Sequence, residues 1–202
     1  MKVTYTLDEE NGLTIHYEAV PDQDTVINMT NHSYFNLNGH KSGSVLHHRM
    51  QILSDAFTPA DAQSIPTGEI CSVDGTPMDF RSTKELGAEI DAAYEPLILG
   101  NGYDHNWVLK NEGRFDKVAE VTGDESSIVM EVWTDRPGVQ VYTANFLENE
   151  AGRNGAVYQK REAVCLETQN YPDAVHQKNF PEAICKKGET YDTKTAYRFH
   201  IE

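Results

Sequence analysis

Glu167 is the residue whose surroundings most suggest acid-base chemistry. The segment Ala163–Gln169 alternates in a way that fits a strand, so one face should carry uncharged neighbours around this carboxylate. These neighbours are Ala163, Cys165 and Gln169, whereas Val164, Leu166 and Thr168 take the other face. Burial there would raise the pKa of Glu167 towards neutrality, which suits a general base. A solvated glutamate on an edge strand is the alternative that this segment leaves open.

His32 lies in a second polar segment, Asn28–Leu37. If this segment is a strand, His32 shares a hydrogen-bonding face with Asn28, Thr30 and Tyr34. An imidazole exchanges protons near neutral pH, so this face could supply an acid. An ordinary solvated face with a hydrogen-bonded histidine is the alternative.

The segment Asn101–Trp107 places Asp104 within four consecutive side chains that can hydrogen-bond, Tyr103 to Asn106, after a flexible glycine. Such a cluster beside a tryptophan suits recognition of a sugar. An Asx-type turn that enters a strand at Trp107–Leu109 explains the same residues equally well.

Other chemistries lack support in the sequence. His47 and His48 are adjacent and would face opposite sides of a strand, so they cannot chelate one ion together, and we expect both at the surface. The three cysteines are far apart and form no C-x-x-C pattern, which argues against a thiolate metal site and a disulfide framework. Dinucleotide, P-loop and serine-elbow motifs do not occur, and no motif supports Cys165 as a nucleophile.

The elements that must position these residues are short alternating segments separated by turns. The predicted strands are Val3–Leu7, Leu13–Tyr17, Val118–Val121, Ile128–Trp133, Val139–Phe146 and Ala163–Thr168. Turn signals such as Glu10–Gly12 and Arg136–Gly138 favour hairpins, so we predict an all-β protein with an antiparallel sandwich or barrel. A capping-box pattern at Ser82–Glu85 predicts one short helix that ends near Ile90. The stretch 55–99 should form long loops that could wall a groove.

Composition restricts the partners. The 202 residues carry 17 Lys+Arg and 32 Asp+Glu, a net charge of −15, which disfavours nucleic acid and anionic membranes. Nothing resembles a membrane span or a signal peptide, and the isolated cysteines indicate a reducing cytoplasm. Without repeats or a linker, we expect residues 1–202 to form a single domain.

Several motifs that occur in one order resemble the aldose 1-epimerase (galactose mutarotase) family. They are Thr30–Leu37 (TNHSYFNL), Gly102–Asn106 (GYDHN), Pro137–Thr143 (PGVQVYT), Leu166–Gln169 (LETQ), and Asn179–Pro181 (NFP) with Lys187–Tyr191 (KGETY). The resemblance runs nearly end to end. It implies a large antiparallel β-sandwich with a sugar groove on one sheet.

The resemblance also implies a role for each matched residue. His32 falls where the family has its general acid, and Glu167 falls where it has its general base. Asp104 and Gln140 match residues that hydrogen-bond sugar hydroxyls, while Ser33 and Tyr34 belong to the stretch that contacts substrate. The implied reaction interconverts the anomers of hexoses such as glucose or galactose and requires no cofactor and no metal.

Full-length members carry a further N-terminal portion that supplies an arginine and another histidine to the sugar, and no part of this chain resembles it. We therefore expect exposed sheet edges and a partly covered apolar face, with self-association or an N-terminal partner chain as a hypothesis. The alternatives to a mutarotase are a sugar-binding protein without activity and one half of a two-chain assembly. A relative acting on hexose 6-phosphates is a third alternative, against which the net charge speaks.

Overall fold

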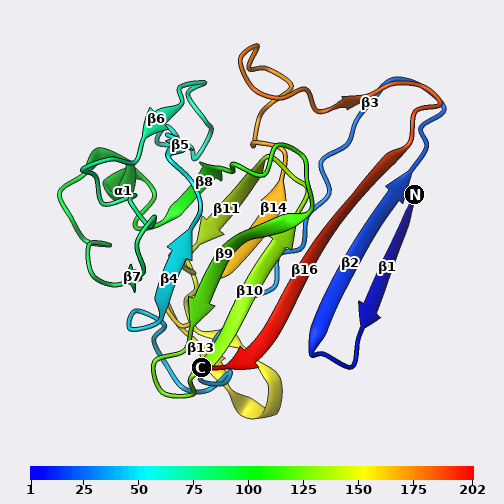
Figure 1. Ribbon diagram of the computed structural model, residues 1–202. Coiled ribbons are helices and arrows are strands. Elements are labelled where there is room, and N and C mark those ends of the chain that lie inside the picture. The colour runs from blue at the N-terminus through cyan, green and yellow to red at the C-terminus, as the bar shows by residue number, and fades with distance from the viewer.

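The computed structural model describes residues 1–202 and contains two facing antiparallel sheets (Figure 1). The seven-stranded sheet has the order β1 (Lys2–Leu7), β2 (Gly12–Ala19), β16 (Tyr191–Ile201), β10 (Ile128–Thr134), β9 (Asp116–Thr122), β4 (Arg49–Ile52) and β7 (Lys84–Glu85). The five-stranded sheet has the order β14 (Cys165–Gln169), β11 (Gly138–Tyr142), β8 (Asp104–Val108), β5 (Ala56–Thr58) and β6 (Cys71–Ser72). The predicted all-β sandwich is confirmed.

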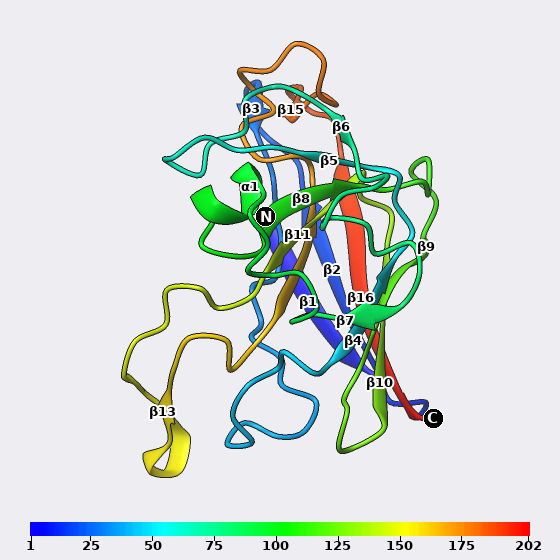
Figure 2. The same cartoon turned by 90° about the vertical axis from the view of Figure 1, so that its left-hand side faces the viewer.

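Small elements complete the chain. β12 (Glu150–Ala151) and β13 (Val157–Tyr158) form a short hairpin, and β3 (Thr25–Val26) pairs antiparallel with β15 (Ile184–Cys185), which lies far along the chain. A 3-10 turn spans Arg153–Gly155, and the one α-helix, α1, spans Glu95–Leu99. In the second view the loops that carry α1, β5 and β6 cross one end of the sandwich (Figure 2), as expected for the stretch 55–99.

The helix predicted from Ser82 to Ile90 is wrong. Lys84 and Glu85 form β7 and pair with Met50 and Arg49 of β4, and the amide of Leu86 then donates to the carbonyl of His48. A helix of so few residues is marginal on its own, so a free sheet edge that offers backbone partners prevails over the capping pattern. The helix that does form begins with Glu95 and Pro96, and Pro is well tolerated in a first turn.

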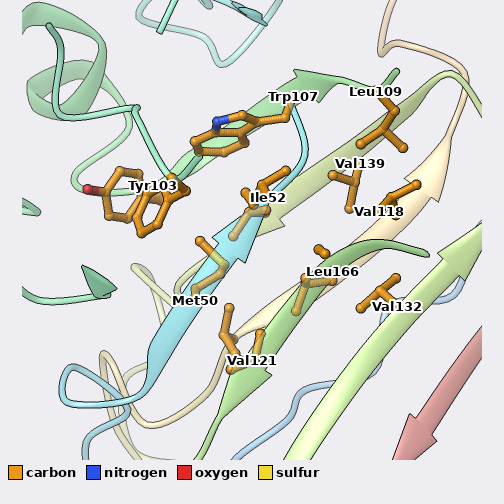
Figure 3. Close-up of a cluster of buried hydrophobic side chains, with 14 of the residues drawn as sticks. Met50, Ile52, Tyr103, Trp107, Leu109, Val118, Val121, Val132, Val139 and Leu166 are labelled. Carbon is orange, nitrogen blue, oxygen red and sulfur yellow. The ribbon is translucent and has the colours of Figure 1, made fainter. Parts of the chain in front are cut away.

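The core lies between the two sheets (Figure 3). Met50, Ile52, Val121 and Val132 come from the seven-stranded sheet and meet the side chains that project from the five-stranded sheet, which are Trp107, Val139 and Leu166. Polar bridges also cross the gap. Tyr197 Oη of β16 donates to the Leu166 carbonyl at 2.9 Å, and the hydroxyls of Thr168 and Thr195 lie 2.6 Å apart. These bonds fix β14 against the opposite sheet.

Trp107 is expected to be a principal stabilising residue. Its indole is fully buried against Phe80 and Tyr103, and Nε1 donates to the Met78 carbonyl at 3.0 Å. We predict that Trp107→Ala lowers the free energy of unfolding by about 3–5 kcal/mol, measured by urea denaturation. Trp133→Ala is the matched control, because that indole is only partly buried, and it should cost much less. Equal losses for the two variants would contradict this account of the core.

Candidate functional site

Three strands of the five-stranded sheet align the site residues by register. Gln140 of β11 lies directly opposite Glu167 of β14 on one side and Asn106 of β8 on the other. Tyr142 is opposite Asp104 in the next row of the same face. Because side chains alternate along a strand, this face points away from the core that Trp107 and Leu166 enter on the other side. The predicted alternation of Ala163–Gln169 is confirmed for β14.

The segment that carries His32 lies alongside β14 but is not a strand, so the condition under which Asn28, Thr30, His32 and Tyr34 would share one face of Asn28–Leu37 is not met. It is attached to the edge of β14 only at its ends. The Asn28 side chain exchanges two hydrogen bonds with the backbone of Asn170, and Phe35 exchanges two backbone bonds with Val164. Between these points the backbone amide of Ser33 donates to Oδ1 of the Asn31 side chain at 3.2 Å. Such a local hydrogen bond competes with the backbone bonds of a regular strand.

This attachment brings His32 to Glu167. The His32 Nε2 atom lies 3.3 Å from Oε1 of Glu167, although 135 positions separate the two residues in the chain. The His32 ring stacks on Tyr34 with ring centroids 5.0 Å apart and meets the Tyr142 ring edge-on at 6.0 Å. An imidazole and a carboxyl group in contact can pass protons to and from one ligand.

These side chains line a groove of about 390 Å³. The lining residues are His32, Tyr34, Asp104, Gln140, Tyr142, Phe146, Glu167, Gln169 and Pro172. The lining combines hydrogen-bonding groups with aromatic rings and contains no Lys or Arg. Such a surface suits a neutral ligand that has both hydroxyl groups and apolar C–H faces.

The carboxyl groups of the groove are strongly perturbed. Burial, with a smaller contribution from the nearby Asp104 carboxylate, raises the pKa of Glu167 to about 7. Burial also raises the pKa of Asp104, which the hydrogen bond from Gln140 Nε2 at 2.8 Å opposes. Glu167 can therefore gain or lose a proton near neutral pH, as expected from its uncharged neighbours.

The start of β8, and with it Asp104, is held by Arg161. Its guanidinium donates to the Asn101 carbonyl at 2.7 Å and to Thr143 Oγ1 at 2.8 Å. It packs so closely on Gly102 that a Cβ there would lie 2.1 Å from Nη1. Arg161 is thus a structural residue, whose side chain is buried outside the groove.

The groove brings together five of the six residues predicted for the site: His32, Tyr34, Asp104, Gln140 and Glu167. Ser33 is not among its lining residues, because adjacent side chains in an extended segment point apart. His105 also leaves the predicted polar cluster. It is buried on the core side of β8, where burial lowers its pKa to about 4.

Sequence reasoning missed Tyr142, Phe146, Gln169 and Pro172 as groove residues. The alternation of side chains along a strand could have indicated two of them. Tyr142 lies two positions after Gln140, and Gln169 lies two positions after Glu167, so each pair shares one face. Loop residues near Thr58 and Pro66 border an adjoining small cavity beside Asp104 and Gln140, as expected for a loop wall.

The surface prediction for the histidine pair is half wrong. His47 is exposed, whereas His48 is completely buried. The Nδ1 atom of His48 lies 2.8 Å from Asp124, and Nε2 accepts the Leu37 amide at 3.0 Å. His48 therefore anchors the chain just after the segment that carries His32 and Tyr34. No cluster of three or more His, Cys, Asp or Glu side chains is arranged to hold a metal, and no helix is long and apolar enough to cross a membrane.

Comparison with known proteins gives consistent matches. The family model described as aldose 1-epimerase matches residues 1–198. The galactose mutarotases of Mus musculus and Homo sapiens are each 44% identical over 200 residues, which is 98% of this chain and 57% of theirs. The aldose 1-epimerase of Escherichia coli (strain K12) is 36% identical over 203 residues, or 99% of this chain and 58% of that protein.

Solved structures are similar over the same extent. The GalM/aldose epimerase homologue from C. elegans matches with a TM-score of 0.88 at 28% identity, covering 98% of this chain and 59% of that one. The galactose 1-epimerase from Lactobacillus acidophilus NCFM matches with a TM-score of 0.83 at 25% identity, covering 98% and 56%. The chain thus spans somewhat more than half the length of these relatives.

The raised pKa of Glu167 predicts a stability cost that depends on pH. The pKa is about 7 in the fold against an ordinary value of 4.5, so the carboxyl is neutral in both states below pH 4.5 and the cost grows as pH rises towards 7. We predict that Glu167→Gln raises the free energy of unfolding by about 2 kcal/mol well above pH 7, somewhat less than the full shift because the groove side is hydrated. Near pH 4.5 this gain should vanish.

Chemical denaturation at the two pH values measures this difference. Glu148→Gln, at an exposed position, is the matched control and should change stability little at either pH. A gain for Glu167→Gln that is the same at both pH values would contradict a buried, titrating carboxyl.

Proposed function

The chain belongs to the aldose 1-epimerase family, and from this premise we propose that it interconverts the α and β anomers of free hexoses such as glucose or galactose. The observation that carries the proposal is the contact between His32 Nε2 and Glu167 Oε1 at 3.3 Å inside the groove. Anomer exchange needs one group that removes the proton of the C1 hydroxyl and another that donates a proton to the ring oxygen. Both oxygens are bonded to C1, so the two groups must lie close together. An acid and a base side by side meet this requirement.

In the proposed mechanism Glu167 is the general base. Its carboxylate takes the proton of the C1 hydroxyl as the bond between C1 and the ring oxygen breaks, which leaves a carbonyl at C1. A base works best when its pKa is near the working pH, and burial beside Asp104 brings Glu167 to about 7. After rotation about the C1–C2 bond the ring closes on the other face, and Glu167 returns its proton to O1.

His32 is the proposed general acid. As an imidazolium it donates a proton to the ring oxygen during opening, and it takes the proton back during closure. Its ring has one face on Tyr34 and remains about half exposed to the groove, so it can reach a bound ligand. The reaction breaks and re-forms one C–O bond with two proton transfers and no change of oxidation state, so the proposed mechanism calls for no cofactor and no metal.

The remaining predicted residues are proposed to hold the sugar. Asp104 and Gln140 are already joined by a 2.8 Å hydrogen bond and present further acceptors and donors to hydroxyl groups. The rings of Tyr34 and Tyr142 can pack on the apolar C–H face of a pyranose. For Ser33 the role as a substrate contact rests on the motif alone.

A free hexose is favoured over a hexose 6-phosphate. The groove contains two carboxyl groups and no Lys or Arg side chain, so a phosphate dianion would meet repulsion without a compensating cation. We further propose that the protein works in the cytoplasm, which suits its three free thiols.

The main test is polarimetric mutarotation of fresh α-D-glucose and α-D-galactose. We predict a rate above that of buffer, and a loss of about 10²–10⁴-fold in Glu167→Gln and in His32→Asn, because each variant lacks one proton-transfer group. Glu148→Gln and His47→Asn are matched controls at exposed positions and should keep the rate. Circular dichroism checks that all variants are folded.

A folded chain that binds hexose in calorimetry but is no faster than buffer would contradict catalysis and support the sugar-binding alternative. Activity that appears only on addition of a second polypeptide would support the two-chain assembly. This outcome is included because the chain covers 57% of the length of its relatives.

The dependence of kcat/KM on pH should reveal Glu167. The rate should fall about tenfold per pH unit below about 7 as the base becomes protonated. Asp104→Asn removes a neighbouring negative charge, so it should lower the pKa of Glu167 and move this limb to lower pH, whatever it does to the maximal rate. Asp116→Asn, on the exposed start of β9, is the control and should leave the limb in place. A limb that does not move in Asp104→Asn would contradict the assignment.

A further inference from the structure

The imidazole of His48 is a buried titratable group that the proposed mechanism does not use. His48 directly precedes β4, and its side chain is completely buried. Both ring nitrogens have a partner. The Leu37 amide donates to Nε2 at 3.0 Å, and Nδ1 lies 2.8 Å from Oδ1 of Asp124, in the turn between β9 and β10. His48 therefore links the chain just after His32 and Tyr34 to the seven-stranded sheet.

These two contacts fix the protonation of the ring. A backbone amide can only donate, so Nε2 must offer a lone pair, and a carboxylate can only accept, so Nδ1 must carry the proton. Burial lowers the pKa of His48, which the hydrogen bond with Asp124 opposes, so the ring is neutral near pH 7. The neutral ring with its proton on Nδ1 satisfies both contacts.

The residue after Leu37 strengthens the same link. The Asn38 side chain donates to Asp124 at 3.1 Å and accepts the backbone amides of Glu125 and Ser126 at 3.2 and 3.1 Å. The Leu37 side chain is itself buried in the core. Residues 37 and 38 are therefore firmly held on the turn between β9 and β10, with the His48 ring at the centre of the contact.

This link bears on His32 because the chain between them is short. His32 lies five positions before Leu37, and Phe35 in between exchanges two backbone bonds with Val164, which directly precedes β14. The chain is thus attached to one sheet at Phe35 and to the other at Leu37. A buried amide without an acceptor is costly, so loss of the His48 ring would make Leu37 move to another partner. A displacement of about 1 Å in a catalytic group can lower a rate by about 10²-fold.

We propose that His48 is a positioning residue for the proposed general acid. Through the Leu37 amide it holds the segment that carries His32 where Nε2 of His32 can contact Glu167 at 3.3 Å. His48 does not line the groove and touches no substrate. The inference rests on the proposed function, because it takes His32 as the acid, and it adds to that function a residue outside the groove.

Two substitutions of His48 separate the hydrogen bond from the packing. His48→Leu fills similar space but offers no acceptor to Leu37, and we predict that kcat for mutarotation falls by about tenfold or more. KM should change by less than about twofold, because Asp104 and Gln140 lie on β8 and β11, which this link does not contact. His48→Gln supplies a side-chain carbonyl oxygen as acceptor and should restore most of kcat.

His47→Leu is the matched control, because this neighbouring histidine is exposed, and it should keep both kcat and KM. Circular dichroism and urea denaturation at the assay temperature check that each variant is folded. A folded His48→Leu variant with unchanged kcat would overturn the proposal. A folded His48→Gln variant that loses as much kcat as His48→Leu would do the same.

Nuclear magnetic resonance tests the link without turnover. The nitrogen resonances of His48 should show a protonated Nδ1 and an unprotonated Nε2. The imidazole resonances of His32 should shift in His48→Leu and stay in place in His48→Gln and His47→Leu. If they do so in a chain that is no faster than buffer, the proposed function fails and the link from His48 to His32 stands. Unchanged His32 resonances in His48→Leu would overturn the link, whatever the activity.

Discussion

The two faces of β14 have opposite requirements, and the site depends on meeting both. Leu166 must pack into the core, and its carbonyl accepts a bond from Tyr197 of the opposite sheet, while Glu167 must reach the groove on the other face. A shift of one residue in the register of β14 would bury Glu167 in the core and expose Leu166. The bonds from Tyr197 and between Thr168 and Thr195 oppose such a shift. The position of the proposed base is therefore fixed from the core side of the sheet.

His32 depends on the same strand, although it lies on an irregular segment. The bonds of Asn28 to Asn170 and of Phe35 to Val164 attach this segment to the two ends of β14, and His48 accepts the amide of Leu37 just beyond it. Between these attachment points the irregular backbone brings the His32 side chain into contact with Glu167. A regular strand there would have kept a flat ladder beside β14. The irregular segment instead lets a side chain from outside the sheet reach a carboxylate within it.

Local patterns in the sequence predicted the parts of the fold that depend on local alternation. The strands at Ile128–Trp133 and Ala163–Thr168 were predicted because a period of two is visible in the residues themselves. The longest strand, β16, was missed, because Tyr191–Ile201 mixes Lys, Arg and Asp with apolar residues and shows its alternation only when its partners β2 and β10 are known. The helix at Ser82 was wrong for the same reason, since the edge of β4 lies far away in sequence.

For the site, residue types and spacing indicated Glu167, and the motifs indicated His32, Asp104 and Gln140. The contact between His32 and Glu167 could not be derived from spacing, because it depends on how a segment outside the sheet is attached to β14. The sequence did contain a signal that His105 and Asp104 point to opposite faces of the sheet, but the alternative of an Asx-type turn left it undecided. Once β8 begins at Asp104, the period of two sends His105 into the core and leaves Asp104 and Asn106 on the groove side.

The groove and β1 lie on different parts of the sandwich. The groove is on the face of β14, β11 and β8 that points away from the seven-stranded sheet, whereas β1 is the far edge of that other sheet. The proposed sugar turnover therefore depends on β14, β11, β8 and the segment that carries His32, and substitutions in β1 should leave the groove unchanged.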